Sequence, residues 1–512
     1  MANSATLSRA QLIYGLCLPL AALIGFFLAE PMRFGSGVVI CMVMGILLWP
    51  LFVKWYHPLL IGSLHSSLVL GFLPGSLPLP AWVGLAFAGF LLVVFQRCLD
   101  SRIDFFPPGG VAMSLIGIAG VVVVTALIRG GIGLRAMGSE SMGSKKYVFL
   151  LMGIATYFVL VTRPVPRKYA LAYVGLFCLS GLSGVLSHLI YFGGSKFFWL
   201  YRFIDSLPAY GQASAAWDVQ GQALVRSVPL MGAASAVVSF MLAWFGVGGM
   251  LQLRKPWRLA LVLVCMAIGL FGGFRSYVVG LGMVLGVAFF LEGLHRTRYL
   301  PILLAVAVVG AGSLAAVSDK LPLSVQRSLS FLPIKIDPGV QMDAQGSLDW
   351  RLQMWELLRK EIPDYLVVGK GFAIDPAAMQ MSSFNSRFGF GIQAEWAVLA
   401  GEYHNGPLSV LVPFGIGGAL TFCWFLIAAA LRLRWFFQHG DPALLNINRA
   451  LFAMFVAKIF FFIVFFGSFY SELVEFVVLI GLAECLNGAP KIEEEPEPVW
   501  SEAVGMGEEG SV

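Results

Sequence analysis

A histidine and an asparagine stand together where a polar stretch of the sequence gives way to an apolar run. His404 and Asn405 belong to the stretch EYHNG at positions 402–406, and the apolar run extends to about 431. An imidazole has an unperturbed pKa of about 6.5, so it can exchange a proton near neutral pH. A lone histidine is more often structural than catalytic. A histidine at the mouth of an apolar bundle nevertheless favours an enzyme.

Two arginines are candidates for binding an anion. Arg275 lies in the stretch GGFRS at 272–276, between two apolar runs with almost no loop between them. A guanidinium is planar, stays charged at any working pH and binds phosphate through two parallel hydrogen bonds. The alternative is an arginine that anchors a helix end at the membrane surface, which explains most arginines in such positions.

The second arginine lies on a predicted amphipathic helix. Ser347 is the expected N-cap of a helix over 347–361, and Pro363 is expected to end it. Arg351 lies in the first turn and borders the apolar face, so its guanidinium is expected to point toward the bundle, with a solvent-facing arginine as the alternative. The expected apolar face consists of Leu348, Leu352, Trp355, Leu358 and Ile362.

Composition requires a membrane around these residues. The 512 residues are 58% hydrophobic and 12% charged, and the mean hydropathy is +0.83. Backbone groups in lipid must be paired within the protein, and the apolar runs are continuous rather than alternating, so they predict helices. The net charge of +6 is small for this length and gives no reason to expect nucleic acid. The seven cysteines follow no disulfide or metal-site spacing, and we expect neither a metal nor a cofactor.

Hydropathy predicts about 14 candidate spans. They lie at about 11–29, 34–53, 58–74, 80–96, 111–129, 147–162, 169–191, 229–250, 259–274, 277–293, 299–317, 406–431, 449–467 and 470–487. The third is weak and could be re-entrant, and the last two could form one broken hairpin. Lys458 lies inside the thirteenth span, with Glu472 and Glu475 in the next, and we expect these charges to form a structural pair.

The distribution of basic residues predicts the orientation. With the N-terminus in the cytoplasm, cytoplasmic loops hold Lys54, Arg97, Arg102, Arg163, Arg167, Lys168, Arg254, Lys255, Arg258, Arg296, Arg298, Arg432, Arg434 and Arg449. The loop 129–146 disagrees, because it places four basic residues on the outer side.

This orientation divides the chain into four parts. We predict a bundle of about 11 spans at 1–317, a large outer loop with short helices at 318–404, C-terminal spans at 405–487, and a disordered acidic cytoplasmic tail at 488–512.

The order of these motifs resembles a known family. An arginine at an outer turn (GGFRS), an arginine-aromatic helix (DWRLQMW), a glycine turn (VVGKGF) and the stretch EYHNGPLSVLVPFGIGG follow one another over about 272–420. This order resembles the O-antigen ligase and O-antigen polymerase superfamily of bacterial inner-membrane glycosyltransferases.

The resemblance implies a fold and an activity. It implies an all-α polytopic membrane protein of about 12–14 transmembrane helices, similar to C-type glycosyltransferases, in the bacterial inner membrane with a periplasmic catalytic loop. Such a protein transfers a glycan from an undecaprenyl-diphosphate carrier to a sugar or lipid-linked glycan acceptor. Arg275 and Arg351 would bind the diphosphate, and His404 would act on the acceptor. The sequence leaves open whether the reaction is ligation or polymerisation.

A transporter of lipid-linked sugar or polysaccharide is the alternative from another class. It would account for the number of spans and for the charges at 458–475. It would not account for an ordered outer insertion that carries arginines and a histidine.

Overall fold

The computed structural model describes residues 34–70, 79–99, 109–131, 144–206, 226–374 and 393–488, together with Ala21, Gly25, 377–378 and 380–382. The chain divides into two units, Met1–His57 and Pro58–Val512. Nearly all of the predicted first span and the acidic tail from 489 onward lie outside the described residues.

One long helix replaces the predicted second and third spans. The helix α2 (Phe34–Ser63) has 30 residues, so Lys54 lies inside a helix and the prediction of a cytoplasmic loop there is wrong. The hydroxyl of Ser63 donates to the Leu60 carbonyl at 2.8 Å, at the point where the helix ends. The strand β1 (Val69–Leu70) then pairs with β2 (Leu79–Pro80) in antiparallel register. The described residues of the predicted span at 58–74 therefore include a helix end and a strand.

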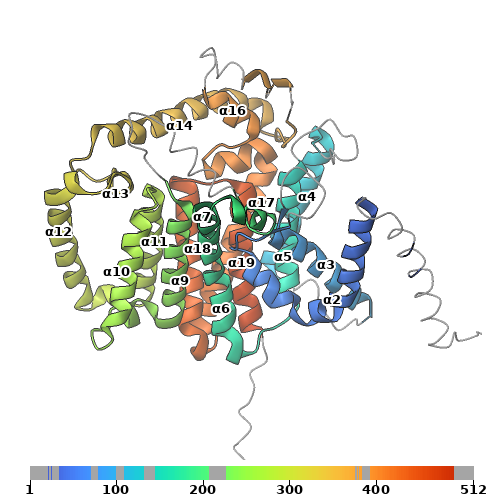
Figure 1. Ribbon diagram of the computed structural model, residues 1–512, viewed down its shortest axis with the longest axis horizontal. Coiled ribbons are helices and arrows are strands. Elements are labelled where there is room, and N and C mark those ends of the chain that lie inside the picture. The colour runs from blue at the N-terminus through green and yellow to red at the C-terminus, as the bar shows by residue number, and fades with distance from the viewer. Residues whose placement is uncertain are drawn as a thin grey trace, which may run out of the picture. The chain divides into compact units, whose positions relative to one another are not determined.

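The second unit is an apolar helical assembly (Figure 1). Apart from α2 and the residues 318–404, its described α-helices are α3 (Ala81–Leu99), α4 (Gly110–Arg129), α5 (Ser144–Val161), α6 (Ala170–Leu179), α7 (Gly184–Gly193), α9 (Val228–Met250), α10 (Pro256–Leu270), α11 (Arg275–Leu291), α12 (Tyr299–Val317), α17 (Gly406–His439), α18 (Leu445–Val464) and α19 (Phe469–Asn487). In the described part of the chain, seven helical segments are long and apolar enough to cross a membrane, and α10 and α11 are shorter apolar helices. The protein is an all-α polytopic membrane protein.

The predicted large loop between α12 and α17 contains helices. Residues 318–404, here called the insertion, contain α13 (Leu323–Ser328), α14 (Pro338–Tyr365) and α16 (Gln393–Ala400). Figure 1 shows α14 lying across one end of the bundle. We call this end of the bundle the insertion end.

The helix α14 differs from the helix that the sequence predicts. Its N-cap is Asp337, ten residues before Ser347, and the Asp337 carboxylate accepts the Gly339 amide at 2.8 Å. Pro363 lies within the last turn and does not end the helix before Tyr365. The residues on its buried face are Val340, Ala344, Met354 and Leu358, whereas Leu348 and Leu352 are about half exposed at 49% and 50%.

A break in α17 receives the glycine turn of the insertion. Gly415 has a left-handed φ of 62° inside α17, and Pro413 precedes it. The amide of Ile416 donates to the Leu366 carbonyl at 2.8 Å, and the amide of Lys370 donates to the Val412 carbonyl at 2.8 Å. The turn 366–371 thus pairs backbone groups that the broken helix leaves free. The two glycine-rich stretches seen in the sequence fit one another.

Loops rich in basic residues meet at the opposite end of the bundle. Arg167, before α6, pairs with Asp441 between α17 and α18. Arg449 lies 3.7 Å from Glu292, at the end of α11. The amide of Val165 donates to the Cys485 carbonyl at 2.8 Å. The loops that the charge pattern groups on one side of a membrane are therefore brought together by the fold.

The predicted charged pair inside the apolar region is present. Lys458 on α18 contacts the carboxylates of both Glu472 and Glu475 on α19. An ammonium between two carboxylates leaves neither charge unpaired in an apolar surrounding. The structural role that the sequence suggests for this cluster is consistent with that geometry.

Candidate functional site

His404 has an unusual backbone conformation. Among the described residues it is the one non-glycine residue with positive φ, at 49°. Left-handed conformations of residues other than glycine cost about 1–3 kcal/mol and concentrate at functional sites. The surrounding structure must therefore hold this residue in place.

Contacts on both sides of His404 fix the loop between α16 and α17. The Lys146 ammonium, on α5, donates to the Ala400 carbonyl at 2.6 Å and to the Glu402 carboxylate at 2.8 Å. The Trp355 indole donates to the Tyr403 carbonyl at 3.0 Å. The Asn405 side chain caps α17 by accepting the Leu408 amide at 3.0 Å. Asn405 thus acts on the helix, and His404 is left as the residue with a free side chain.

The imidazole of His404 lies between two aromatic rings. Its centroid is 5.2 Å from that of Trp350 on α14 and 5.2 Å from that of Phe466, in the turn between α18 and α19. Within the described part of the chain, neither ring nitrogen has a hydrogen-bond partner. A proton acceptor held by packing alone can accept a hydrogen bond from a bound molecule.

The surroundings favour the neutral imidazole. Burial lowers the pKa of His404, the charge of Arg351 lowers that pKa further, and the carboxylate of Glu402 acts in the opposite direction. A histidine whose pKa lies below its ordinary value is unprotonated at neutral pH, which is the state that a general base requires.

Gly406 lets the end of α18 approach His404. A Cβ atom at Gly406 would collide with the backbone carbonyl and the ring of Phe462. This close contact between α17 and the end of α18 places Phe466 beside His404. The glycine after the His-Asn pair therefore has a packing role that contributes to the site.

Arg351 lies near His404, and the sequence predicted that its guanidinium points toward the bundle. Its guanidinium carbon is 5.8 Å from the centroid of the Phe466 ring, which also contacts His404. Burial lowers the pKa of Arg351, and the charges of Arg275 and Arg226 lower it further. The guanidinium groups of Arg275 and Arg226 therefore lie close enough to Arg351 to repel its charge.

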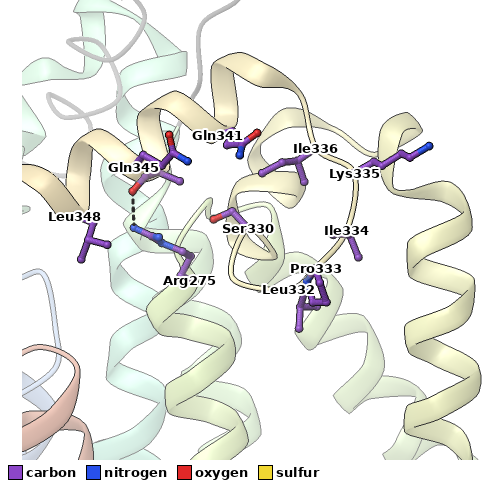
Figure 2. A pocket seen from close by; sticks show the side chains of 11 residues that line it. Arg275, Ser330, Leu332, Pro333, Ile334, Lys335, Ile336, Gln341, Gln345 and Leu348 are labelled. Atoms are coloured by element: carbon purple, nitrogen blue, oxygen red, sulfur yellow. Dashed lines mark hydrogen bonds between the residues drawn. The ribbon is translucent and has the colours of Figure 1, made fainter.

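Arg275 is directed toward the insertion rather than toward open solvent. It is the first residue of α11, and its guanidinium donates to the Ala344 carbonyl of α14 at 3.4 Å (Figure 2). The helix α14 thus contacts one predicted arginine and carries the other. Its Ala344 carbonyl accepts from Arg275, and Arg351 lies about two turns further along the helix.

Three charged residues that the sequence did not single out as site residues complete the cluster. The Asp343 carboxylate accepts from Arg226 at 2.7 Å and from Arg327 at 2.6 Å. The Arg327 guanidinium also donates to the Gly273 carbonyl, next to Arg275. Arg327 is buried, with 4% of its side chain exposed. The sequence does not show that Arg327 is buried, so it could not indicate that this arginine belongs to the site.

Asp343 neutralises only part of this charge. The Asp343 carboxylate pairs with Arg226 and Arg327, and the charges of Arg226 and Arg275 act on Arg351. In the described ranges, neither Arg275 nor Arg351 has a carboxylate within salt-bridge distance. Such an arrangement attracts an anion.

A cavity of about 650 Å³ lies next to Arg275. Figure 2 shows it between α14 and the segment 330–336, with Ser330, Gln341 and Gln345 among its polar lining residues. The hydroxyl oxygen of Ser330 is buried and has no hydrogen-bond partner among the described residues. Ligand sites usually enclose about 300–1,000 Å³ and combine apolar walls with a few polar groups, as this cavity does.

The basic loop that contradicted the charge pattern holds the insertion in place. The Arg129 guanidinium, at the end of α4, donates to the carbonyls of Gly369 and Val368, each at 2.9 Å. Lys146 holds residues 400–402, as described above. Two of the four basic residues of the loop 129–146 thus contact the glycine turn and the His404 loop.

His188 is buried on α7. Among the described residues, no group of three or more His, Cys, Asp or Glu side chains is arranged to hold a metal ion. The cluster around His404, Arg275 and Arg351 is the candidate site.

Comparisons with known proteins do not identify the chain. No model of a known protein family matches it, and neither does any characterised protein sequence.

Proposed function

We propose that this protein transfers a glycan from an undecaprenyl-diphosphate carrier to a sugar hydroxyl, at the insertion end of the bundle. The observation that carries the proposal is the imidazole of His404, whose pKa is lowered by burial and by Arg351, together with Arg275 and Arg351, which have no carboxylate partner among the described residues. The order of motifs over 272–420, which resembles O-antigen ligases and polymerases, supports the same function. The insertion end would then face the periplasm of a bacterial inner membrane.

The diphosphate of the donor would bind between Arg275 and Arg351. Its departure from the sugar places negative charge on the leaving oxygen, and guanidinium groups stabilise this charge more in the transition state than in the ground state. The donor therefore needs no metal to leave, and activity should persist in the presence of a chelator. The cavity beside Arg275 has room for a further part of a substrate.

His404 would act as the general base toward the acceptor. A sugar hydroxyl is a poor nucleophile, and removal of its proton as the anomeric carbon is attacked is typically worth about 10²–10⁴-fold in rate. Attack from the side opposite the diphosphate inverts the anomeric centre. The carbon–oxygen bond to the diphosphate breaks, the bond to the acceptor oxygen forms, and the proton passes to His404.

His404→Gly and His404→Asn test the proposal without unfolding the protein. Glycine and asparagine tolerate the left-handed backbone of this position, so the free energy of unfolding should change by no more than about 1 kcal/mol. Neither side chain accepts a proton near neutral pH. With purified protein, a glycan on a lipid diphosphate and an acceptor, both variants should lose nearly all turnover.

Near-normal turnover in both variants would remove His404 from the mechanism. A transporter would instead move the lipid-linked glycan between leaflets without cleaving the sugar–phosphate bond, and this assay separates the two functions directly. Surface-glycan analysis after deletion would then distinguish the reactions. Unattached lipid-linked chains indicate a ligase, whereas loss of long chains alone indicates a polymerase.

A further inference from the structure

Two short helices at the insertion end expose an apolar surface. The first is α7, and the second is the 3-10 helix η4 (Ser195–Arg202) that follows it. Phe192 is 70% exposed and Trp199 is 59% exposed. We call the following set the aromatic–basic surface: Leu186, Leu189, Phe192, Phe197, Phe198 and Trp199, together with Lys196 and Arg202.

This surface includes the last part of a candidate membrane-crossing segment and the 3-10 helix that follows it. The segment Arg167–Gly193 contains α6, η3 (Ser180–Ser183) and α7. A Cβ atom at Gly184 would lie 3.7 Å from the Cβ of Pro229, the second residue of α9. The Ser227 amide, just before α9, donates to the Gly272 carbonyl at 3.0 Å, near Arg275. The helix α7 therefore starts level with the insertion end of α9, and η4 follows it there.

Hydrogen bonds fix these helices to the protein on their other side. The Tyr201 hydroxyl donates to the Ser187 carbonyl at 2.9 Å, and the Ser187 hydroxyl donates to the Asp205 carbonyl at 2.7 Å. The Val69 amide of β1 donates to the Phe203 carbonyl at 2.8 Å. The aromatic rings are thus presented outward on a structured support.

The charge of the surface is positive throughout. No acidic residue occurs between 184 and 204, and Lys196 and Arg202 are its charged residues. Among the described residues, neither has an ion pair. Aromatic rings beside basic side chains are typical of segments that lie in the interface of a membrane, with rings among the acyl chains and charges among the headgroups.

We propose that the aromatic–basic surface lies in the membrane interface at the insertion end and binds anionic phospholipid headgroups through Lys196 and Arg202. The rings of Phe197, Phe198 and Trp199 would enter the acyl-chain region. This inference is independent of the proposed glycan transfer, because it concerns a surface remote in sequence from Arg275, Arg351 and His404.

A probe that reports contact with lipid chains tests the depth of the surface. The protein lacking its seven native cysteines carries a fluorophore at Trp199→Cys, in bilayers that contain phospholipids brominated on their chains. We expect strong quenching at this position. The matched control is Met342→Cys on α14, which is 73% exposed and should not be quenched. Equal, weak quenching at both positions would overturn the proposal.

The charge requirement is tested by placing bromine only on an anionic phospholipid within a zwitterionic bilayer. Quenching at Trp199→Cys should exceed that given by the same fraction of brominated zwitterionic lipid. The changes Lys196→Gln and Arg202→Gln should each reduce this preference by about fivefold. A preference that survives both changes would contradict the assignment. So would a probe shielded from lipid in native membranes, because a protein partner would then cover the surface.

Discussion

At the scale of single residues, His404 is held by its neighbours rather than by its own side chain. Lys146, Trp355 and Asn405 fix the loop, and among the described residues the imidazole contacts the rings of Trp350 and Phe466. Because neighbouring residues hold the loop, the ring nitrogens of His404 can bind a substrate. The proton exchange of His404 should then respond to the charges of Glu402 in its loop and Arg351 on α14.

The pH dependence of transfer follows from the pKa of His404. Because burial and Arg351 lower this pKa, the acid limb of the pH–rate profile should lie below the ordinary value of about 6.5. Glu402→Gln removes the charge that raises the pKa, so it should move the limb to lower pH. Arg351→Gln removes a charge that lowers it and should move the limb to higher pH. Steady-state rates and NMR titration of His404 measure both shifts.

Asp319→Asn provides the control for these shifts. Asp319 lies in an exposed turn after α12, so its loss should leave the acid limb in place. Shifts of the same sign in Glu402→Gln and Arg351→Gln would show that another group controls the profile.

The two unpaired arginines should not tolerate lysine. A lysine ammonium keeps the charge but cannot form the two parallel hydrogen bonds of a guanidinium to phosphate. Arg275→Lys and Arg351→Lys should therefore both lower the rate of transfer, and the alanine variants should lower it by about 10²–10³-fold. Arg359→Lys, an exposed change on the same helix as Arg351, should have no effect. Full activity of Arg275→Lys and Arg275→Ala at normal abundance would make Arg275 a helix-end anchor.

At the scale of elements, the break in α17 joins the insertion to the bundle. The turn 366–371 fills the break, and Arg129 binds two carbonyls of that turn. The same insertion carries α14, whose residues contact both Arg275 and His404. The packing of the turn 366–371 into the break of α17 is therefore expected to set the distance from Arg275 and Arg351 to His404.

Gly369→Ala tests this joint. A Cβ atom at Gly369 would collide with the Pro413 carbonyl group, so the turn could not enter the break. We expect a loss of about 1–3 kcal/mol in the free energy of unfolding, together with loss of transfer. Gly417→Ala is the matched control on α17, because its Cβ would lie 3.7 Å from Val121 and fit without strain. Thermal unfolding in detergent compares the two, and equal melting temperatures would argue against the joint.

At the scale of the whole molecule, the two ends of the second unit differ in their loops. One end carries the long insertion with its arginine cluster, and short loops rich in Lys and Arg meet at the other. Short basic loops usually stay in the cytoplasm. The insertion end should then face the outside, which is where a lipid-linked glycan would be used.

Cysteine labelling from outside the cell tests this orientation. In a background without native cysteines, Gln345→Cys on α14 should react with an impermeant reagent in intact cells. Leu253→Cys, which is 82% exposed at the opposite end, should react only after the membrane is broken. The reverse pattern would contradict both the orientation and the proposed function.

The sequence by itself determined the class of fold and suggested candidate residues for the site. Long apolar runs allow only helices in lipid, so the spans from 80–96 onward could be located by hydropathy. The charge pattern grouped loops that the structure brings together. His404, Arg275 and Arg351 stood out because their types suit proton and phosphate chemistry and because they lie at boundaries of apolar runs.

Only the tertiary structure decided how these residues act together. The left-handed backbone of His404 depends on contacts with α5 and α14, which are distant in sequence. Arg226, Arg327 and Asp343 form one cluster across more than a hundred residues, and no local pattern encodes such a pairing. The start of α14 and the single helix α2 were mispredicted from sequence. Caps and packing decide where a helix ends, and hydropathy averaged over a window does not register them.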